Sequence, residues 1–423
     1  MTSKSVPTEE RISLLSTMRR VIRTEQIWVK PFAHLSNLCH HSNALYNQAT
    51  YLVRHHYFAT KEWLRYPQFY HELKTSPHYQ ALPAQTAQQI LKLVEKNFKS
   101  FFNAITAKKK NPRKFKDTPK FPYYKKSGSE FSLFFTNQQI RLKKGVLHLP
   151  KKILQKKTRF SKETVFRGAR IHPRGDLYLL EVLYEIEVPM PEPKHERMIA
   201  IDLGVNNLVT MINNFGELPI AVKGGVAKSI NQWYNKIRSH LQSHFDKNKL
   251  EYNERKKKID FQRNKQIKDL FHKLSCAILN YCLYYRVDTI VIGYNPLWKQ
   301  KVNLGKVNNQ NFVSLPFLKL LQMIQYKAED HGICVIIVEE AYTSKCSFLD
   351  QEPIKKHATY VGKRLHRGMF RSKNGTFINA DVNSAYNILR KVFPKAFPNG
   401  IEDVGLHPHC IKFVPSGTCD LII

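Results

Sequence analysis

The order of predicted strands and helices between residues 198 and 392 is the feature that most restricts how this chain can fold. Three short apolar strands come first, in MIAIDLG, VTMINN and LPIAVKG, and their close spacing predicts an antiparallel meander. Apolar residues at helical spacing then predict two long basic helices at about 226–246 and 249–285. A strand at 289–292, a helix at about 316–330, a strand in ICVIIVEE and a helix at about 382–392 follow. This series predicts a mixed sheet, in which three antiparallel strands are extended by parallel ones through helical crossovers.

This order is that of a ribonuclease H-like fold, and a different pattern precedes it. A strand in EQIWVKPF leads into two helical stretches, and short alternating strands occupy residues 131–189. The basic, proline-interrupted segment 107–128 is predicted to be a linker or a loop that faces nucleic acid. Because a strand precedes the helices, we expect the helices to be an insertion within a β-rich module. The sequence therefore predicts an α+β multidomain protein.

Positive charge is spread along the whole chain. Lys and Arg total 68 against 33 Asp and Glu, which gives a net charge of +35 at pH 7. Tyr and Phe are interleaved with the basic residues, a pattern that suits a groove for phosphate backbones. A solvated basic surface is the alternative, although so large an imbalance destabilises the compact state unless a partner neutralises it. No apolar run of about 18 residues and no signal-peptide pattern occurs, so we expect a protein of the prokaryotic cytoplasm with no membrane partner.

The cysteines are widely separated, and no two of them form a CxxC pair. A disulfide framework is not expected in a cytosolic chain of this size, and no pair has the spacing of a zinc ribbon. The string His407, Pro408, His409, Cys410 is interpreted as a chance grouping and not as a metal site. The seven cysteines are Cys39, Cys276, Cys282, Cys334, Cys346, Cys410 and Cys419.

Acidic residues at strand ends stand out in so basic a chain. Phosphodiester cleavage on this fold uses two divalent metals about 4 Å apart, and magnesium prefers carboxylate oxygens. Asp202 ends the apolar strand MIAI and precedes Leu203 and Gly204; a turn-forming aspartate is the alternative. Asp381 stands just before the last predicted helix, where it can serve as a metal ligand, as an N-cap, or as both. We expect the two carboxylates to converge at one end of the sheet.

Three stretches resemble motifs of the TnpB family, the transposon-encoded RNA-guided nucleases ancestral to type V CRISPR effectors. IAIDLGVNNLVT is similar to the first RuvC motif of that family. YTSKCS and NADVNSAYNILRK resemble its end, where a YTS stretch opens a zinc ribbon and an aspartate-asparagine-alanine stretch closes the nuclease domain. The resemblance implies a RuvC nuclease domain and, upstream, a β-barrel-like wedge module that holds a helical recognition insertion. The implied bounds are 1–35 and 111–196 for the wedge module, 36–110 for the insertion, and 197–423 for the nuclease domain, with long basic helices at 226–285 and a ribbon-like loop at 344–380.

The resemblance also implies partners and cofactors. A guide RNA pairs with one strand of double-stranded target DNA, and the wedge module with its insertion recognises a short motif beside the target. Base pairing supplies sequence, while the protein holds the heteroduplex by its shape and backbone. Two magnesium ions, for which manganese can substitute, support hydrolysis. The protein is expected to be monomeric on its RNA.

The chain departs from the family pattern in its ribbon. Family members usually have two CxxC pairs between the YTS stretch and the last aspartate, and this chain has only Cys346 there. We therefore predict no structural zinc and a shortened or remodelled loop.

The second departure concerns the catalytic glutamate. The family's second RuvC motif is an apolar strand that ends in a glutamate, and TIVIGYN has Gly293 at that place. The next strand, CVIIVEEAYTS, ends with Glu339 and Glu340 at the same end of the sheet, and adjacent strands lie about 4.8 Å apart, within reach of a glutamate side chain. Consecutive strand residues point to opposite faces, so only one of the pair should face the metals unless the strand has ended. We favour Glu340, with Glu339 as the runner-up; solvated charges at a strand end are the alternative.

The expected catalytic groups are thus Asp202, Glu340 or Glu339, and Asp381, and the expected magnesium ligands are Asp202, Glu340 and Asp381. Asn206 and Asn383 are interpreted as turn or helix-start residues that could orient ligands, and Trp298 with Lys299 as a possible contact to nucleic acid. Three rival functions are considered: a nuclease-inactive, RNA-guided repressor, a compact CRISPR effector of TnpB descent, and a DDE-type transposase.

Overall fold

The structure is a computed structural model, and it describes residues 18–248, 254–295, 315–366 and 368–412. Trp298 and Lys299 lie outside these residues. The chain divides into two compact units, one formed by Arg20–Glu187 and the other by the remaining residues, which are chiefly Val188–Ile423. No helix in the described part of the chain is long and apolar enough to cross a membrane.

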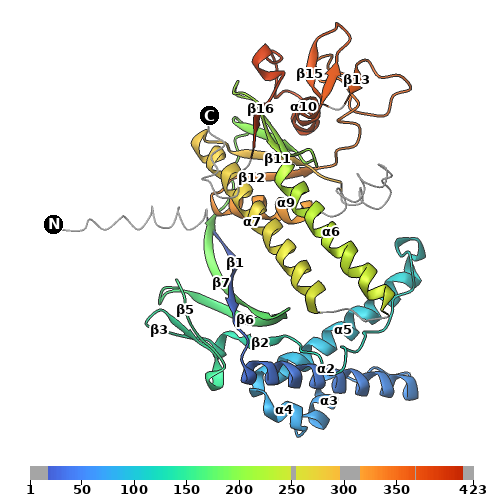
Figure 1. The fold of residues 1–423 in the computed structure, drawn as a ribbon, viewed down its shortest axis with the longest axis vertical. Helices are drawn as coiled ribbons and strands as arrows, with labels where there is room; N and C mark the ends of the chain where they lie inside the picture. The colour runs from blue at the N-terminus through green and yellow to red at the C-terminus, as the bar shows by residue number, and fades with distance from the viewer. Residues whose placement is uncertain (1–17, 249–253, 296–314, 367, 413–423) are drawn as a thin grey trace, which may run out of the picture. The chain divides into compact units, whose positions relative to one another are not determined.

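The Arg20–Glu187 unit combines a four-stranded sheet with a group of helices (Figure 1). The strand order is β1-β7-β6-β2, and β6 and β7 form a long antiparallel hairpin. Four helices lie in the chain between β1 and β2, where the sequence predicted two helical stretches. The bounds are β1 Met18–Val29, α2 Ala33–Thr60, α3 Tyr66–Leu73, α4 Pro77–Ala81, α5 Ala84–Lys110, β2 Leu133–Thr136, β6 Val165–Arg174 and β7 Leu177–Pro189.

One apolar core joins these helices to the sheet. Ile90, Val94 and Phe98 recur at helical spacing on α5 and are fully buried, because this spacing places them on one face. Leu133 of β2 and Leu180 of β7 belong to the same core. A second small antiparallel sheet follows β2, made of β3 (Arg141–Lys143), β4 (Val146–His148) and β5 (Gln155–Lys157).

The second unit is built around a mixed sheet with the order β12-β11-β8-β9-β10-β16 in the described residues. β8, β9 and β10 form the predicted antiparallel meander, and β11 and β12 extend it as parallel strands. β16, which the sequence did not predict, pairs with β10 in parallel. The bounds are β8 Met198–Asp202, β9 Asn207–Asn213, β10 Ile220–Lys223, β11 Thr289–Gly293, β12 Cys334–Val338 and β16 His409–Ile411.

Helices cover both faces of this sheet. The alternation of side chains along a strand places Ile199 and Ile201 of β8 in a core with α7 (Glu254–Tyr284) and α9 (Phe317–Asp330). Met198 and Ala200 point to the other face and pack against α10 (Ala380–Val392). Figure 1 shows α6 (Gly225–Lys247) and α7 as two long helices that lie side by side. The helices predicted in this region are thus confirmed, with ends that differ by a few residues.

The ribbon-like segment between β12 and α10 contains a small antiparallel sheet, β13-β14-β15. Its strands are short: β13 Lys363–His366, β14 Met369–Arg371 and β15 Phe377–Asn379.

Candidate active site

Asp202 is the last residue of β8, and the neighbouring parallel strand β11 ends at the same edge of the sheet. The side chain is partly buried, and the pKa of its carboxyl is raised well above its usual value, first by burial and then by the negative charges of Glu340 and Asp381. A hydrogen bond from Ser384 and the charge of Arg364 act in the opposite direction. The structure therefore brings Asp202, Glu340 and Asp381 within electrostatic range of one another.

Asp381 lies in the first turn of α10. Asn379 is the N-cap, and its side chain accepts hydrogen bonds from the backbone N–H groups of Asp381 and Val382, so the interpretation of Asp381 as the N-cap is wrong. The Asp381 carboxylate is instead free to face the sheet, where Oδ2 accepts a hydrogen bond of 2.8 Å from Asn207 and Oδ1 lies 3.6 Å from Arg364. A negative charge is also favourable at a helix N-terminus.

Glu340 lies two residues beyond the end of β12. Its backbone N–H donates to Asn295 Oδ1 at 3.0 Å. The carboxyl atom Oε1 is buried without a hydrogen-bond partner, and burial raises the pKa of Glu340 to about 7. Because a buried carboxylate oxygen without a partner is costly, this atom needs either a proton or a cation.

Gly293 ends β11 and lies against the Glu340 side chain. Gly293 is opposite Val338 in the parallel pair β11–β12. A Cβ atom built on Gly293 would lie 2.8 Å from Glu340 Cγ and 2.5 Å from Ile388 Cδ1. The Glu340 side chain thus occupies space that a side chain at position 293 would otherwise need.

Glu339 is exposed, in contrast to Glu340. Its backbone carbonyl accepts a hydrogen bond of 2.7 Å from Lys391 Nζ, and its charge does not contribute to the raised pKa values of Asp202 and Glu340.

The three carboxyl groups suit a divalent metal in their chemistry. They supply the hard oxygen ligands that magnesium prefers, and a cation would relieve both their mutual repulsion and the unpartnered Glu340 Oε1. As they stand in the described part of the chain, no three His, Cys, Asp or Glu side chains are arranged closely enough to hold a metal ion.

Asn206 lies in a bend, as expected for a turn residue, and the asparagine that contacts the site is its neighbour, which the sequence did not single out. Asn207, not Asn206, contacts Asp381; Asn206 accepts a hydrogen bond from Lys228. Asn383 is the fourth residue of α10, as expected for a residue near the helix start, and its fully buried side chain bonds Phe348 N–H and the Cys346 carbonyl. Asn383 and Asn387 are four residues apart, which puts both on one helix face. This spacing was the sequence signal that both side chains could bond the same loop, at the Cys346 carbonyl.

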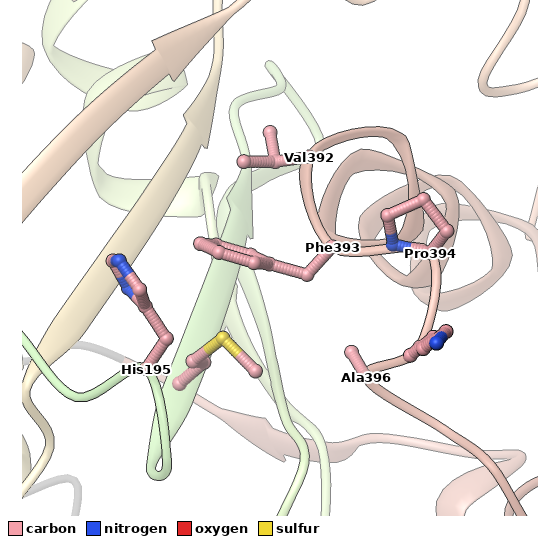
Figure 2. Close-up of a pocket in the computed structure, with 7 residues that line it drawn as sticks. His195, Val392, Phe393, Pro394 and Ala396 are labelled. Carbon is pink, nitrogen blue, oxygen red and sulfur yellow. The ribbon is translucent and has the colours of Figure 1, made fainter.

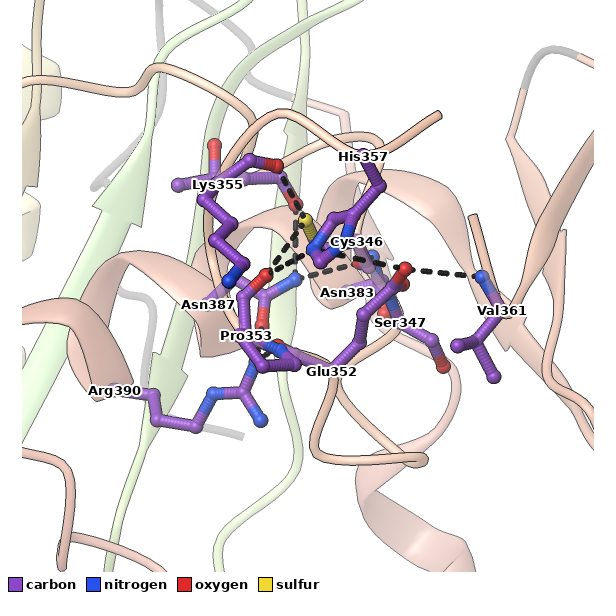
Figure 3. A network of polar contacts seen from close by, with 11 residues as sticks. Cys346, Ser347, Glu352, Pro353, Lys355, His357, Val361, Asn383, Asn387 and Arg390 are labelled. Atoms are coloured by element: carbon purple, nitrogen blue, oxygen red, sulfur yellow. Dashed lines mark hydrogen bonds and ion pairs between the residues drawn. The ribbon is translucent and has the colours of Figure 1, made fainter. Parts of the chain in front are cut away.

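The ribbon-like segment is held by a buried carboxylate (Figure 3). Glu352 accepts hydrogen bonds from Ser347 N–H at 2.8 Å and from Val361 N–H at 3.0 Å. Cys346, the single cysteine of the segment, donates from Sγ to the Pro353 carbonyl at 3.4 Å, and burial raises the pKa of its thiol. His357 also donates to the Pro353 carbonyl.

Two of the cavities in the described part of the chain are relevant to the position of the site. One of about 600 Å³ borders the site and is lined by basic and aromatic groups that include Lys345, Tyr360 and Arg364. The other, of about 390 Å³, is mostly apolar and lies between His195 and the Phe393 end of α10 (Figure 2). His195 bonds Thr289 at the start of β11, so this second cavity lies at the opposite end of the sheet from Asp202.

Comparisons with known proteins match two stretches of the chain, which lie chiefly in the second unit. A family model described as a probable transposase, OrfB_IS605, matches residues 181–298, and a model described as Cas12f1-like, TNB domain, matches residues 317–388. The TnpB-like protein ORF457 of Acidianus two-tailed virus is 25% identical over 215 residues, and the putative RNA-guided DNA endonuclease InsQ of Escherichia coli (strain K12) is 25% identical over 329 residues. The resemblance to the TnpB family is confirmed.

The extent of these matches differs. The TnpB-like relative ORF457 covers 48% of this chain and is itself covered to 44%, so the chain spans less than half of its length. For InsQ the shares are 73% and 74%. Among solved structures, a Cas12f1–sgRNA–target DNA complex matches with a TM-score of 0.52 at 14% identity, over 84% of this chain and 81% of that one. This last likeness shows a shared fold.

Proposed function

We propose that this chain is an RNA-guided DNA endonuclease of the TnpB type, which hydrolyses target DNA after guide RNA pairing beside a short target-adjacent motif. The observation that carries the proposal is the convergence of Asp202, Glu340 and Asp381 at one sheet end. InsQ is named as a putative RNA-guided DNA endonuclease, and a further relative, Cas12f2 of a Micrarchaeota archaeon, as a CRISPR-associated endodeoxyribonuclease, which supports the same activity.

Asp202, Glu340 and Asp381 are the proposed ligands of magnesium, which would activate a water and stabilise the leaving oxygen when bound. Glu340 would take the place of the glutamate that the family resemblance implies at the end of β11, where this chain has Gly293. Asn207 holds one Asp381 oxygen and leaves the other toward Arg364. Ser384 holds Asp202 from the adjacent helix.

The proposed parts of the chain follow from the same resemblance. The sheet unit that begins near Met198 would be the RuvC nuclease domain. The sheet of β1, β2, β6 and β7 would belong to a barrel-like wedge module, and helices α2–α5 would be its recognition insertion. Guide RNA and double-stranded target DNA would be the partners that the resemblance implies, and the net charge of +35 favours such polyanions.

Aromatic and basic side chains on the helical part suit contacts with nucleic acid. Tyr51 and Phe58 of α2 and Tyr124 are exposed, and the Arg54 guanidinium lies 5.0 Å from the centre of the Tyr124 ring. Exposed rings can stack on bases while arginine neutralises phosphate.

Purified protein with its copurified RNA tests the proposal. Asp202→Ala should abolish cutting of a matched duplex while guide binding stays intact; a variant that still cuts would contradict the assignment. Parent protein that binds matched DNA tightly but never cuts would favour the repressor. Sequencing the bound RNA separates a transposon-end guide from a CRISPR repeat-array guide.

A further inference from the structure

The backbone of Glu340 is fixed by hydrogen bonds outside the sheet. Its N–H donates to Asn295 Oδ1 at 3.0 Å. Its carbonyl accepts two hydrogen bonds from Thr343, one from the backbone N–H at 3.1 Å and one from Oγ1 at 2.9 Å. Because β12 ends at Val338, the strand ladder does not set the position of Glu340. The turn from Glu340 to Thr343 sets it instead.

Helix α10 holds this turn. Asn387 Nδ2 donates to the Thr343 carbonyl at 2.9 Å and to the Cys346 carbonyl at 2.8 Å. Thr343 Oγ1 lies 3.2 Å from Ser384 Oγ, and Ser384 also hydrogen-bonds Asp202. Asn387, Thr343 and Ser384 are all buried, so water does not substitute easily for these bonds.

The same face of α10 contacts the chain on either side of the turn. Lys391 Nζ donates to the Glu339 carbonyl at 2.7 Å. Asn383 bonds the Cys346 carbonyl and the Phe348 N–H. Residues 383, 387 and 391 recur every four positions, which places them in a row along one helix face.

We propose that Asn387 is a positioning residue, which fixes Glu340 relative to Asp381. Asp381 lies in the first turn of α10. Asn387 lies about two turns later in the same helix and donates hydrogen bonds to the loop that carries Glu340. A rigid helix thereby sets the relation between two carboxylates whose chain segments are about 40 residues apart. The inference rests on the proposed function, because it concerns the metal site of that nuclease.

Asn387→Asp is the sharpest test. The substitution keeps the side chain's shape and the Oδ1 acceptor that bonds Arg390, but removes both N–H donors. We expect single-turnover cleavage of a matched duplex to fall at least tenfold at limiting magnesium and to recover in part at high magnesium. Binding of guide RNA and of target should stay within twofold of the parent. Hydrogen exchange at the Glu340 and Thr343 amides, measured without metal, should accelerate.

Asn213→Asp is the matched control. Asn213 is also buried and also donates from Nδ2 to a loop carbonyl, that of Glu217, at 2.8 Å. It pairs with Ile199 at the opposite end of β8 from Asp202. We expect this variant to melt at a lower temperature, with an unchanged magnesium requirement and unchanged exchange at Glu340.

A purely structural role for Asn387 would give the two variants the same profile, and that result would overturn the inference. If Asn387→Asp does not fold, Thr343→Val removes the hydroxyl bond to the Glu340 carbonyl and should raise the magnesium requirement in the same way; an unchanged requirement would overturn the inference equally. A parent protein that never cuts matched DNA would contradict the proposed function. The exchange measurement would then still decide, because unchanged exchange at Glu340 in Asn387→Asp refutes positioning by itself.

Discussion

Gly293→Ala should displace the Glu340 side chain. The new Cβ would lie 2.5 Å from Ile388 Cδ1 and 2.8 Å from Glu340 Cγ, whereas carbon atoms in contact pack at about 3.5–4.0 Å. Ile388 Cδ1 is the end of a flexible side chain and can rotate away. Glu340 Cγ would have to move by about 1 Å to restore that contact distance, and the carboxyl group would move with it. Overpacking of this kind lowers the free energy of unfolding by about 1–3 kcal/mol. We expect the folded variant to cleave more slowly as well, because its carboxyl group is displaced.

A carboxylate placed at position 293 should compensate for the loss of the one at position 340. Glu340→Ala alone should slow cleavage about 100-fold or more, since a metal ligand supports several kcal/mol of transition-state stabilisation. Gly293→Glu combined with Glu340→Ala removes the Cγ atom that the new side chain would meet, and places a carboxylate at the end of β11. We expect the double variant to cut at least tenfold faster than either single variant.

The assay is single-turnover cleavage of an end-labelled matched duplex by the saturated guide complex, with melting curves and guide binding measured on the same preparations. The parent, Gly293→Glu, Glu340→Ala and the double variant form a double-mutant cycle, which isolates the coupling between positions 293 and 340. A double variant that folds and binds guide like the parent, yet cuts no faster than Glu340→Ala, would refute the idea that both positions serve one metal site. Gly293→Ala with parental activity would refute the steric argument.

Three further substitutions address the remaining groups. Asp202→Asn should abolish cleavage in magnesium and yet raise the melting temperature in chelator, because one of three mutually repelling acidic groups loses its charge; a lower melting temperature in chelator would contradict that repulsion. Glu339→Ala should cut within about twofold of the parent, as expected for an exposed surface charge, and a large loss would restore Glu339 as the ligand. Glu352→Ala should lower the free energy of unfolding by about 1–3 kcal/mol, since the buried Ser347 N–H loses its acceptor while the N–H of the exposed Val361 can bond water instead, and chemical denaturation measures this. Elemental analysis should find no stoichiometric zinc, and one zinc per chain would overturn that expectation.

The sequence predicted the six-stranded sheet well, except for β16, because its signals are local. The meander, the parallel strands and α9 follow from apolar periodicity, and Asp202 follows from its place after four apolar residues of β8. β16 was missed because a strand of three residues, His409–Ile411, is too short to show a period. The N-cap role considered as an alternative for Asp381 belongs to Asn379, since both are good capping residues and only the helix geometry distinguishes them.

The choice between Glu339 and Glu340 illustrates where such reasoning ends. Alternation along a strand assigns one residue to each face only while the strand continues, and β12 stops at Val338. Beyond that point the direction of each side chain depends on Asn295 and on the polar face of α10, which lie 45 and about 50 residues away. Gly293 provides the remaining condition, because any larger residue at the end of β11 would compete with Glu340 for the same space. The glutamate at 340 and the glycine at 293 therefore depend on each other in this fold, because a side chain at 293 would meet Glu340 Cγ.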